Sequence, residues 1–207
     1  MNIEHQKQQL FSYWEKNDLI SSDNVLKAFM AVPRELFIDP SYRDQSYADH
    51  PLPIGCDQTI SQPSTVMLML QLLELIPGQR ALEIGTGSGY NAALIAEINR
   101  EVVTVERIPQ LAKIAKLNLK KAGYHDVIVV KGDGKKGYLP LAPYDRIMVT
   151  AATQKVPKQL KDQLSVGGLL VAPIGATYRC DMVTIKKISS NHFQTSNHGL
   201  FSFVPLV

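Results

Sequence analysis

The amino-acid sequence predicts an α/β fold built on a doubly wound, mainly parallel sheet. Its 207 residues suit one domain, and 45% hydrophobic with 20% charged residues is the composition of an ordinary globular protein. From Arg80 onward, short segments rich in branched aliphatic residues alternate with amphipathic segments of helical length. A glycine-rich turn follows the first of these segments, and parallel sheets bind ligands beyond the carboxyl ends of their strands.

The first part of the chain is expected to be helical and connecting rather than part of the sheet. Residues 6–16 have helical periodicity. Asp23 is a candidate cap for a second helix over residues 24–31, which ends before Pro33. Residues 40–53 are rich in Tyr, Asp and Pro and are predicted to form a loop.

The alternating part of the chain predicts the elements of the core. Helices are predicted over residues 63–75, 90–99, 109–122 and 156–164, with Gly123 ending the third. Strands are predicted over residues 80–84, 101–106, 127–130, 144–150, 169–173, 182–188 and 200–205. The pattern leaves the order of the last strands open. We expect a single domain, with N-terminal helices and a substrate loop over residues 1–62 and an α/β core over residues 63–207.

The charge and the apolar pattern favour a cytoplasmic protein that binds neither membrane nor nucleic acid. The net charge is only +3, and the densest basic cluster, residues 113–121, has the spacing of a solvated helix face. Residues 1–9 are polar and do not resemble a signal peptide, and the longest apolar stretch, residues 66–76, is too short to span a bilayer. Cys56 and Cys180 lack metal-ligand spacing, so we expect free thiols and no metal.

The turn after the first core strand has the glycines of a ligand loop. Gly85, Gly87 and Gly89 give the spacing G-x-G-x-G, in which the backbone can approach a ligand without an intervening Cβ. Dinucleotide-binding turns usually have G-x-G-x-x-G and face a pyrophosphate. S-adenosylmethionine (SAM) has no pyrophosphate, so the shorter spacing favours SAM, and Glu83 is placed to reach its amino group directly or through water. A purely structural tight turn is the alternative.

Two acidic residues at the ends of the next two strands extend the predicted cofactor site. Glu106 ends the second strand, 21 positions after Gly85, where an acid can accept hydrogen bonds from both ribose hydroxyls. Asp133, which follows the third strand, can accept a hydrogen bond from the adenine amine. Glu106 alone would fit NAD as well, and Asp-Gly is a common turn pair. Together with the glycine loop, the two acids predict a nucleotide-type cofactor at the ends of three successive strands.

Four stretches of the sequence carry a more specific pattern: residues 51–55 with 58–63, 83–90, 132–138 with 142–147, and 149–152 with 163–164 and 167–168. With them the chain resembles the protein-L-isoaspartate(D-aspartate) O-methyltransferase family over nearly its whole length. The first and third stretches are specific to this family. The resemblance implies a Rossmann-like SAM-dependent methyltransferase fold. It also implies transfer of a methyl group from SAM to the α-carboxylate of L-isoaspartyl and D-aspartyl residues in damaged proteins, which initiates repair and leaves S-adenosylhomocysteine.

The resemblance further implies roles for individual residues. Ser61 matches the designated active-site residue of the family. Cofactor contacts are implied for Thr59, Ile60, Glu83, Gly85, Thr86, Gly87, Ser88, Glu106, Arg107, Asp133, Gly134 and Thr150. Substrate contacts are implied for Ile54, Gly55, Ser61, Thr150, Ala151 and Ala152. The implied partners are isoaspartyl proteins and peptides, and we expect a monomer.

Three features depart from the family pattern. Asp57 stands where bacterial relatives often carry Gly, and we expect its carboxylate either to repel an anionic substrate or to face solvent. Cys180 replaces a Gln of many relatives. The chain ends at Val207, so we expect the C-terminal tail of animal relatives to be absent and its cofactor contacts to be missing or replaced.

The predicted chemistry needs no strong general base, because a carboxylate nucleophile with a reference pKa of about 4 is ionised at neutral pH. The five histidines fall in polar or loop-like segments and are expected at the surface. Ser61 lacks a G-x-S-x-G turn, so we expect it to orient the substrate carboxylate by hydrogen bonding rather than to attack. A local cap before Pro63 is the simpler alternative. The family picture suggests that isoaspartate is selected by a peptide backbone extended across residues 54–63.

Other functions remain open at the level of sequence. Methyltransferases of base amino groups often have Asn/Asp-Pro-Pro-aromatic after the fourth strand, where this chain has Thr150-Ala151-Ala152-Thr153. A methyltransferase of another small substrate fits the same cofactor site. A nucleotide-dependent oxidoreductase is disfavoured by the glycine spacing. A non-catalytic module that binds SAM or isoaspartyl protein stays open because of Asp57.

Overall fold

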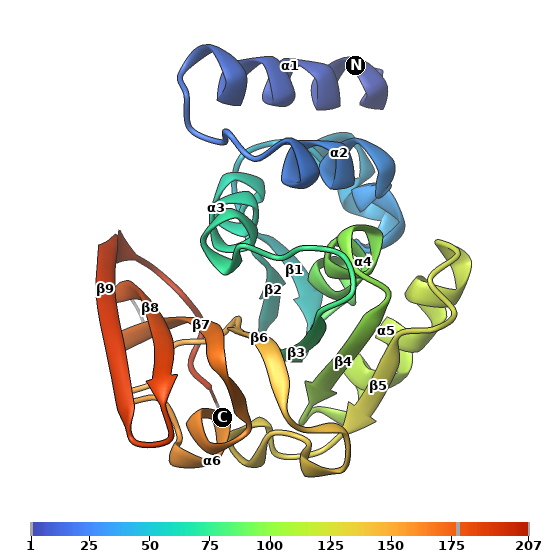
Figure 1. Ribbon diagram of the computed structural model, residues 1–207. Helices are drawn as coiled ribbons and strands as arrows, with labels where there is room; N and C mark the ends of the chain where they lie inside the picture. Colours follow the sequence, from blue (N-terminus) through green and yellow to red (C-terminus); the bar gives the residue numbers. More distant parts are fainter. Residues whose placement is uncertain (1, 177–178, 207) are drawn as a thin grey trace.

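The computed structural model describes residues 2–176 and 179–206. Within them, a central sheet of seven strands has the order β5-β4-β3-β6-β7-β8-β9 (Figure 1). The strands are β3 (Arg80–Ile84), β4 (Glu101–Glu106), β5 (Ile128–Lys131), β6 (Tyr144–Val149), β7 (Leu164–Ala176), β8 (Arg179–Ser189) and β9 (His192–Phe201). The strands from β5 to β7 are parallel, and β8 and β9 continue as an antiparallel meander. The predicted α/β, mainly parallel sheet is confirmed.

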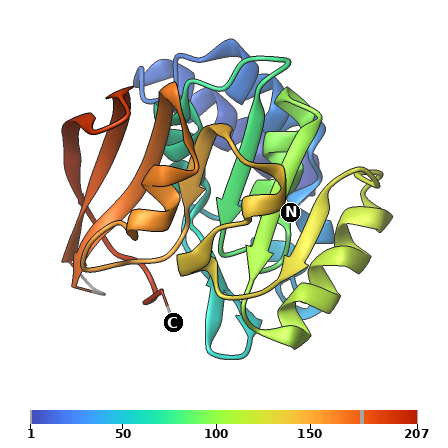
Figure 2. The ribbon, with the colours of Figure 1, turned by 60° about the horizontal axis from the view of Figure 1, so that its bottom comes forward.

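Helices cover both faces of this sheet, which is why its central strands are apolar almost throughout (Figures 1 and 2). The helices are α3 (Pro63–Leu73), α4 (Tyr90–Ile98), α5 (Pro109–Lys121) and α6 (Lys158–Asp162). Ala81 of β3 joins the apolar cluster that contains α3 and α4. Its neighbour Leu82 joins the cluster on the opposite face, which contains Leu160 of α6.

A helical layer packs above α3 and α4 (Figure 1). It consists of α1 (Ile3–Lys16), α2 (Asp23–Ala31), η1 (Arg34–Leu36) and η2 (Pro40–Gln45). Trp14 is fully buried, with its ring edge-on to Phe29 at 4.6 Å and its Nε1 donating to Ser64 Oγ at 2.6 Å. One cluster of buried apolar side chains runs from this layer through α3 and α4 to the sheet. The N-terminal helices therefore share the core of the α/β part.

The structure corrects the predicted loop over residues 40–53, because its end belongs to a hairpin. β1 (Leu52–Gly55) pairs antiparallel with β2 (Gln58–Ile60). The two turn residues, Cys56 and Asp57, both have positive φ (53° and 57°), as type I′ turns require. The Asn-Gly or Asp-Gly pair that normally signals such a turn is absent, so the sequence pattern does not announce the hairpin.

The predicted strand over residues 200–205 is wrong. β9 runs from His192 to Phe201, and the chain then leaves the sheet and bridges to Ala152 through Pro205. Nearly all side chains of β9 are exposed, so no apolar alternation marks this edge strand.

β3 and β4 have the predicted bounds, and most of the remaining elements lie within three residues of their predicted positions. β7 is much longer than predicted, because it begins at Leu164, five residues before the predicted strand. The helix predicted over residues 156–164 shortens to α6, with Pro157 as its N-cap. Asp23 is the first residue of α2 rather than its cap, a position that Ser22 occupies. Gly123 follows α5 with a φ of 92°, as the predicted stop requires.

Candidate active site

A cavity lies at the carboxyl ends of β3, β4 and β6, the edge of the sheet where parallel folds bind ligands. The space within it that no atom fills, part of which is open to solvent, is about 730 Å³. The predicted site residues that line it are Thr59, Ile60, Ser61, Gly85, Thr86, Gly87, Ser88, Glu106, Arg107, Gly134, Thr150 and Ala151. The fold thus brings residues from the hairpin and from three strand ends to one cavity, called here the cofactor cavity.

Other predicted residues lie beside this cavity without lining it: Ile54, Gly55, Glu83, Asp133 and Ala152. Ile54 contacts the glycine loop, since a Cβ built on Gly87 would lie 3.2 Å from its Cδ1. Asp133 uses Oδ1 to accept the Lys135 N–H at 3.0 Å and so caps a short 3-10 turn.

Several residues that line the cofactor cavity were not predicted from the sequence: Gln58, Ile84, Tyr90, Asn91, Val105, Ile108, Leu111, Val204, Pro205 and Leu206. Leu111 lies on the apolar face of α5, where periodicity indicates only a core position. Residues 204–206 reach the cavity because Ala152 N donates to Val204 O at 2.7 Å and Leu206 N donates to Ala152 O at 2.8 Å. No local pattern signals a contact between segments so far apart.

The glycine loop approaches the end of β6 so closely that it has no room for a side chain at Gly85. This residue has a φ of 94°, and a Cβ built on it would collide with Thr150 Oγ1. The Thr150 hydroxyl lies 2.9 Å from Ile84 O and 2.7 Å from Gly85 O, so it can donate to either carbonyl. A Cβ on Gly134 would likewise collide with the Ile84 side chain. The backbone therefore forms part of the cavity wall.

Glu106 connects the glycine loop to the start of α5. Its Oε2 accepts the Gly87 N–H at 2.8 Å and its Oε1 accepts the Ile108 N–H at 2.9 Å. Glu106 is 6% exposed and lines the cavity. Because each carboxylate oxygen can accept a second hydrogen bond, Glu106 can still bind two hydroxyl groups of a ligand.

Glu83 lies within the protein rather than in the cavity wall. Its Oε2 accepts the Thr104 hydroxyl at 2.5 Å, and Thr104 Oγ1 lies 2.6 Å from Thr86 Oγ1. Thr86 lines the cavity, so a chain of hydroxyls joins the buried carboxyl to the glycine loop. Burial raises the pKa of Glu83 to about 8, against the hydrogen bond from Thr104, which lowers it. The carboxyl is therefore largely protonated at neutral pH.

We expect Glu83 to make stability fall as pH rises, because the folded state retains a proton that the unfolded state releases above its ordinary pKa of 4.5. The stabilisation is complete below that value and is lost as pH rises through about 8. Its slope reaches about 1.4 kcal/mol per pH unit. Urea unfolding across this pH range measures the effect, and Glu83→Gln should remove it. The same slope in both proteins would contradict this assignment.

A second, larger cavity adjoins the first and is called here the peptide cavity, after the ligand that we propose for it. The two share Thr59, Ser61, Val204 and Pro205. The rest of its wall is mainly apolar or uncharged, and among the described residues its charged members are Asp57 and Arg179. Asp57, one of the residues that depart from the family pattern, thus lines a cavity. Ser61 lies at the junction between the two spaces.

The two cysteines occupy different environments, and neither lines a described cavity. Cys180 is buried in β8, where its Sγ donates to Phe201 O at 3.1 Å, so this departure lies inside the sheet. Cys56 is exposed in the hairpin turn. In the described part of the chain, no helix has the length and apolar character needed to cross a membrane.

Several known proteins are similar to this chain over nearly its whole length. A sequence model of the protein-L-isoaspartate(D-aspartate) O-methyltransferase family matches residues 5–207. The protein-L-isoaspartate O-methyltransferase of Staphylothermus marinus is 47% identical, over 99% of this chain and 95% of its own. Protein-L-isoaspartate O-methyltransferase 1 of Archaeoglobus fulgidus is 47% identical, over 97% of this chain and 93% of its own.

Solved structures give the same result. A Plasmodium falciparum protein-L-isoaspartate O-methyltransferase, crystallised with S-adenosyl-L-homocysteine, matches with a TM-score of 0.85 at 25% identity, over 96% of this chain and 97% of its own. Another protein-L-isoaspartate O-methyltransferase matches with a TM-score of 0.84 at 32% identity, over 96% of this chain and 65% of its own. The predicted fold and the family resemblance are therefore confirmed, and the chain belongs to the protein-L-isoaspartate(D-aspartate) O-methyltransferase family.

Proposed function

We propose that this chain, a SAM-dependent protein carboxyl methyltransferase, methylates the α-carboxylate of L-isoaspartyl and D-aspartyl residues at the junction of its two cavities. The observation that carries the proposal is that Thr59 and Ser61 line both spaces. A cofactor in one cavity and a peptide in the other would meet there. Family membership argues against the oxidoreductase and nucleic-acid alternatives.

The cofactor cavity has the features that SAM requires. Gly85 and Gly134 line the cavity, and a Cβ on either would collide with Thr150 or Ile84, so this shape of the wall requires glycine at both positions. Glu106 would accept the ribose hydroxyls, as its position at the end of β4 favours. When bound, SAM supplies an electrophilic methyl group on a sulfonium. The residues of the cofactor cavity would hold its adenosine part, and the acceptor would bind at the junction.

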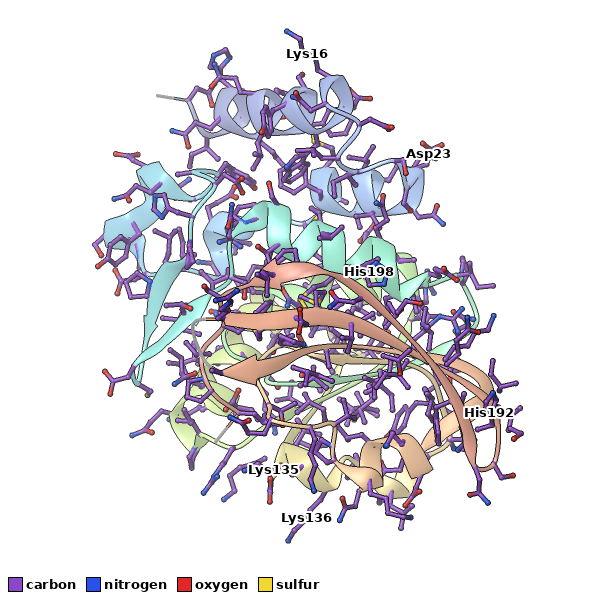
Figure 3. The ribbon with its side chains drawn as sticks, turned by 90° about the vertical axis from the view of Figure 1, so that its left-hand side faces the viewer. Lys16, Asp23, Lys135, Lys136, His192 and His198 are labelled. Atoms are coloured by element: carbon purple, nitrogen blue, oxygen red, sulfur yellow. The ribbon has the colours of Figure 1, made fainter. Side chains whose placement is uncertain are left out.

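The acceptor needs orientation rather than activation. A carboxylate is already ionised at neutral pH, and neither cavity is lined by a histidine of the described residues. Figure 3 shows His192 and His198 on β9, where both are exposed. We assign to Ser61 the hydrogen bond that orients the substrate carboxylate. The apolar wall of the peptide cavity, including Phe203, would exclude water from the reacting pair.

The direct test is incubation with methyl-labelled SAM and an isoaspartyl peptide, beside its aspartyl twin. We expect a base-labile methyl ester on the isoaspartyl peptide only. Binding of both ligands without transfer would instead identify a binding module. Label on both peptides, or on a small carboxylic acid alone, would overturn the assigned substrate.

Ser61→Ala should lower kcat/KM for an isoaspartyl peptide by about 10- to 100-fold, because a hydrogen bond to a charged group contributes about 1.5–3 kcal/mol. The dissociation constant for SAM should change little. Ser61→Thr retains a hydroxyl and is the matched comparison, which should keep more activity. Initial-rate kinetics over both substrates measure these effects. Unchanged kcat/KM in Ser61→Ala would mean that Ser61 does not orient the substrate carboxylate; the local-cap alternative has no support, because Gln62 is the N-cap of α3.

The two charged residues of the peptide cavity should set the preference of the enzyme for the charge of its peptide substrate. Asp57→Asn should raise kcat/KM about two- to fivefold for isoaspartyl peptides with acidic flanks, and Arg179→Gln should lower it similarly, as partly solvated charges contribute up to about 1 kcal/mol. A peptide with neutral flanks is the control. Added salt should shrink both effects. Equal responses for acidic and neutral peptides would mean that these side chains face solvent.

We propose a cytoplasmic monomer with a single folding domain, because both cysteines are free thiols and one apolar cluster joins the N-terminal layer to the sheet. Light scattering should give a mass near 23.0 kDa. Unfolding followed by Trp14 fluorescence and by far-ultraviolet circular dichroism should coincide. A dimer mass or two separate transitions would contradict the proposal.

A further inference from the structure

Arg34 is a fully buried arginine that contacts residues of the active-site wall without lining either cavity itself. It is the first residue of η1 and is 0% exposed. Its Nη2 donates to Ser61 O at 2.8 Å and its Nε donates to Ser46 O at 2.8 Å. Its guanidinium lies 4.9 Å from the centre of the Tyr90 ring. One side chain of the N-terminal layer therefore contacts both the segment of residues 58–64, called here the substrate loop, and Tyr90, the first residue of α4.

This arrangement is energetically costly. Burial lowers the pKa of Arg34, and among the described residues the guanidinium forms no ion pair. Its Nη1 and the Tyr90 hydroxyl are both buried and form no hydrogen bond of normal geometry. Desolvating the charge is costly, and the two carbonyls, Tyr90 and the nearby Asp49 carboxylate offset only part of this cost. An apolar side chain of similar volume would fill the space more cheaply, so packing alone does not account for an arginine here.

The contacts of the substrate loop indicate what the guanidinium does. Asp49 anchors the far end of this loop: it accepts from Ser64 N at 2.9 Å, from Ser64 Oγ at 2.7 Å and from Gln62 Nε2 at 3.0 Å. These bonds would persist without Arg34. The Ser61 peptide is held by the guanidinium, whose planar fork fixes it relative to Ser46 and Tyr90.

We infer that Arg34 is a positioning residue for methyl transfer: it fixes the Ser61 peptide against the first turn of α4 and so sets the distance between the substrate carboxylate and the methyl donor. The inference rests on the proposed function for its kinetic consequence. It assigns to Arg34 no contact with either ligand, since Arg34 lines neither cavity. The N-terminal layer, which supplies Arg34, thereby becomes part of the catalytic apparatus.

The test compares Arg34→Gln and Arg34→Lys with Lys7→Met. Lys7 is the matched control: it is a buried cation of the same layer, 5% exposed, whose Nζ donates to Met30 O at 2.7 Å and lies 5.5 Å from the Tyr47 ring. It has no contact with Ser61. Losing either cation should lower the melting temperature, but only the Arg34 variants should displace the substrate loop.

We expect kcat for an isoaspartyl peptide to fall by about 30- to 100-fold in Arg34→Gln, because small misplacements of reacting groups can cost about 100-fold. The dissociation constant for SAM should stay within about threefold. Lys7→Met should keep the wild-type kcat at a temperature where it is folded. In Arg34→Ala, added ethylguanidinium should restore part of kcat. If kcat per folded molecule is unchanged in Arg34→Gln or Arg34→Lys, the residue is only structural and the inference fails.

Hydrogen exchange separates this inference from the proposed function, because it needs no turnover. The amides of residues 58–62 should exchange faster in Arg34→Gln than in wild type or Lys7→Met, while those of residue 64 stay protected by Asp49. Equal exchange in all proteins would overturn the inference. If wild type fails to methylate the isoaspartyl peptide but the exchange differs as expected, the substrate assignment fails and the positioning contact stands. If Arg34→Gln does not fold, Arg34→Lys keeps the charge without the fork, and both measurements are made on it.

Discussion

Glu106→Gln is expected to raise the dissociation constant for SAM by about 30- to 100-fold. In wild type, each carboxylate oxygen already accepts one backbone N–H, from Gly87 at 2.8 Å and Ile108 at 2.9 Å. An amide would place an NH₂ group against one of these donors, which loses its acceptor. The ligand would also lose one charged acceptor. Hydrogen bonds to charged groups contribute about 1.5–3 kcal/mol, and each 1.4 kcal/mol is about tenfold in affinity.

Isothermal titration with SAM and with S-adenosylhomocysteine measures this effect, and Glu101→Gln is the matched control. Glu101 is the first residue of the same strand, so it lies at the opposite end of β4 from Glu106. Its exposed carboxylate pairs there with Arg80 at 3.0 Å. Exposed ion pairs contribute little, so this variant should bind SAM as wild type does. Similar affinities in both variants would mean that Glu106 does not hold the ribose.

Gly85→Ala should destabilise the protein by about 2–4 kcal/mol and weaken SAM binding at least about 100-fold. Left-handed backbone costs a non-glycine residue about 1–2 kcal/mol, and here the added Cβ would also collide with Thr150 Oγ1. Relief requires the Thr150 hydroxyl or the loop itself to move, and both line the cofactor cavity.

Gly78→Ala introduces the backbone strain without the collision and so separates the two effects. Gly78 has a φ of 86°, close to the 94° of Gly85, but a Cβ there meets nothing within 4 Å. Its cost in urea unfolding should be about 1–2 kcal/mol, with SAM affinity unchanged. If both variants lose the same stability and both bind SAM normally, close approach at Gly85 is not what the cavity requires.

The sequence predicted the parallel part of the fold well because burial on both faces leaves a strong local signal. β3 and β4 are apolar runs bounded by turn residues, and their limits agree with prediction. The hairpin and β9 lack such a signal. Cys56 and Asp57 form a turn that normally prefers Asn-Gly, and β9 exposes polar side chains along an edge. The hairpin and β9 both form because they pair with a neighbouring strand, and the local sequence carries no information about that strand.

The residues of the candidate site likewise fall into those that the sequence predicts and those that it does not. Gly85 and Glu106 were predictable because each sits at a fixed place relative to a strand end. Arg34 and Pro205 were not, because their roles arise from contacts between segments distant in the chain. Glu83 has the predicted position in the motif but a different environment, joined to the glycine loop through Thr104 and Thr86 rather than open to the cavity. Motif spacing predicts backbone position, while burial is settled by packing.

The segment that returns to Ala152 has a consequence for ligand binding. Val204 and Pro205 form part of the wall of both cavities, so a ligand in either cavity would contact the same short stretch of the chain. The factor by which bound SAM changes the affinity for the peptide must therefore equal the factor by which bound peptide changes the affinity for SAM. The shared wall makes occupancy of the two cavities a single linked equilibrium.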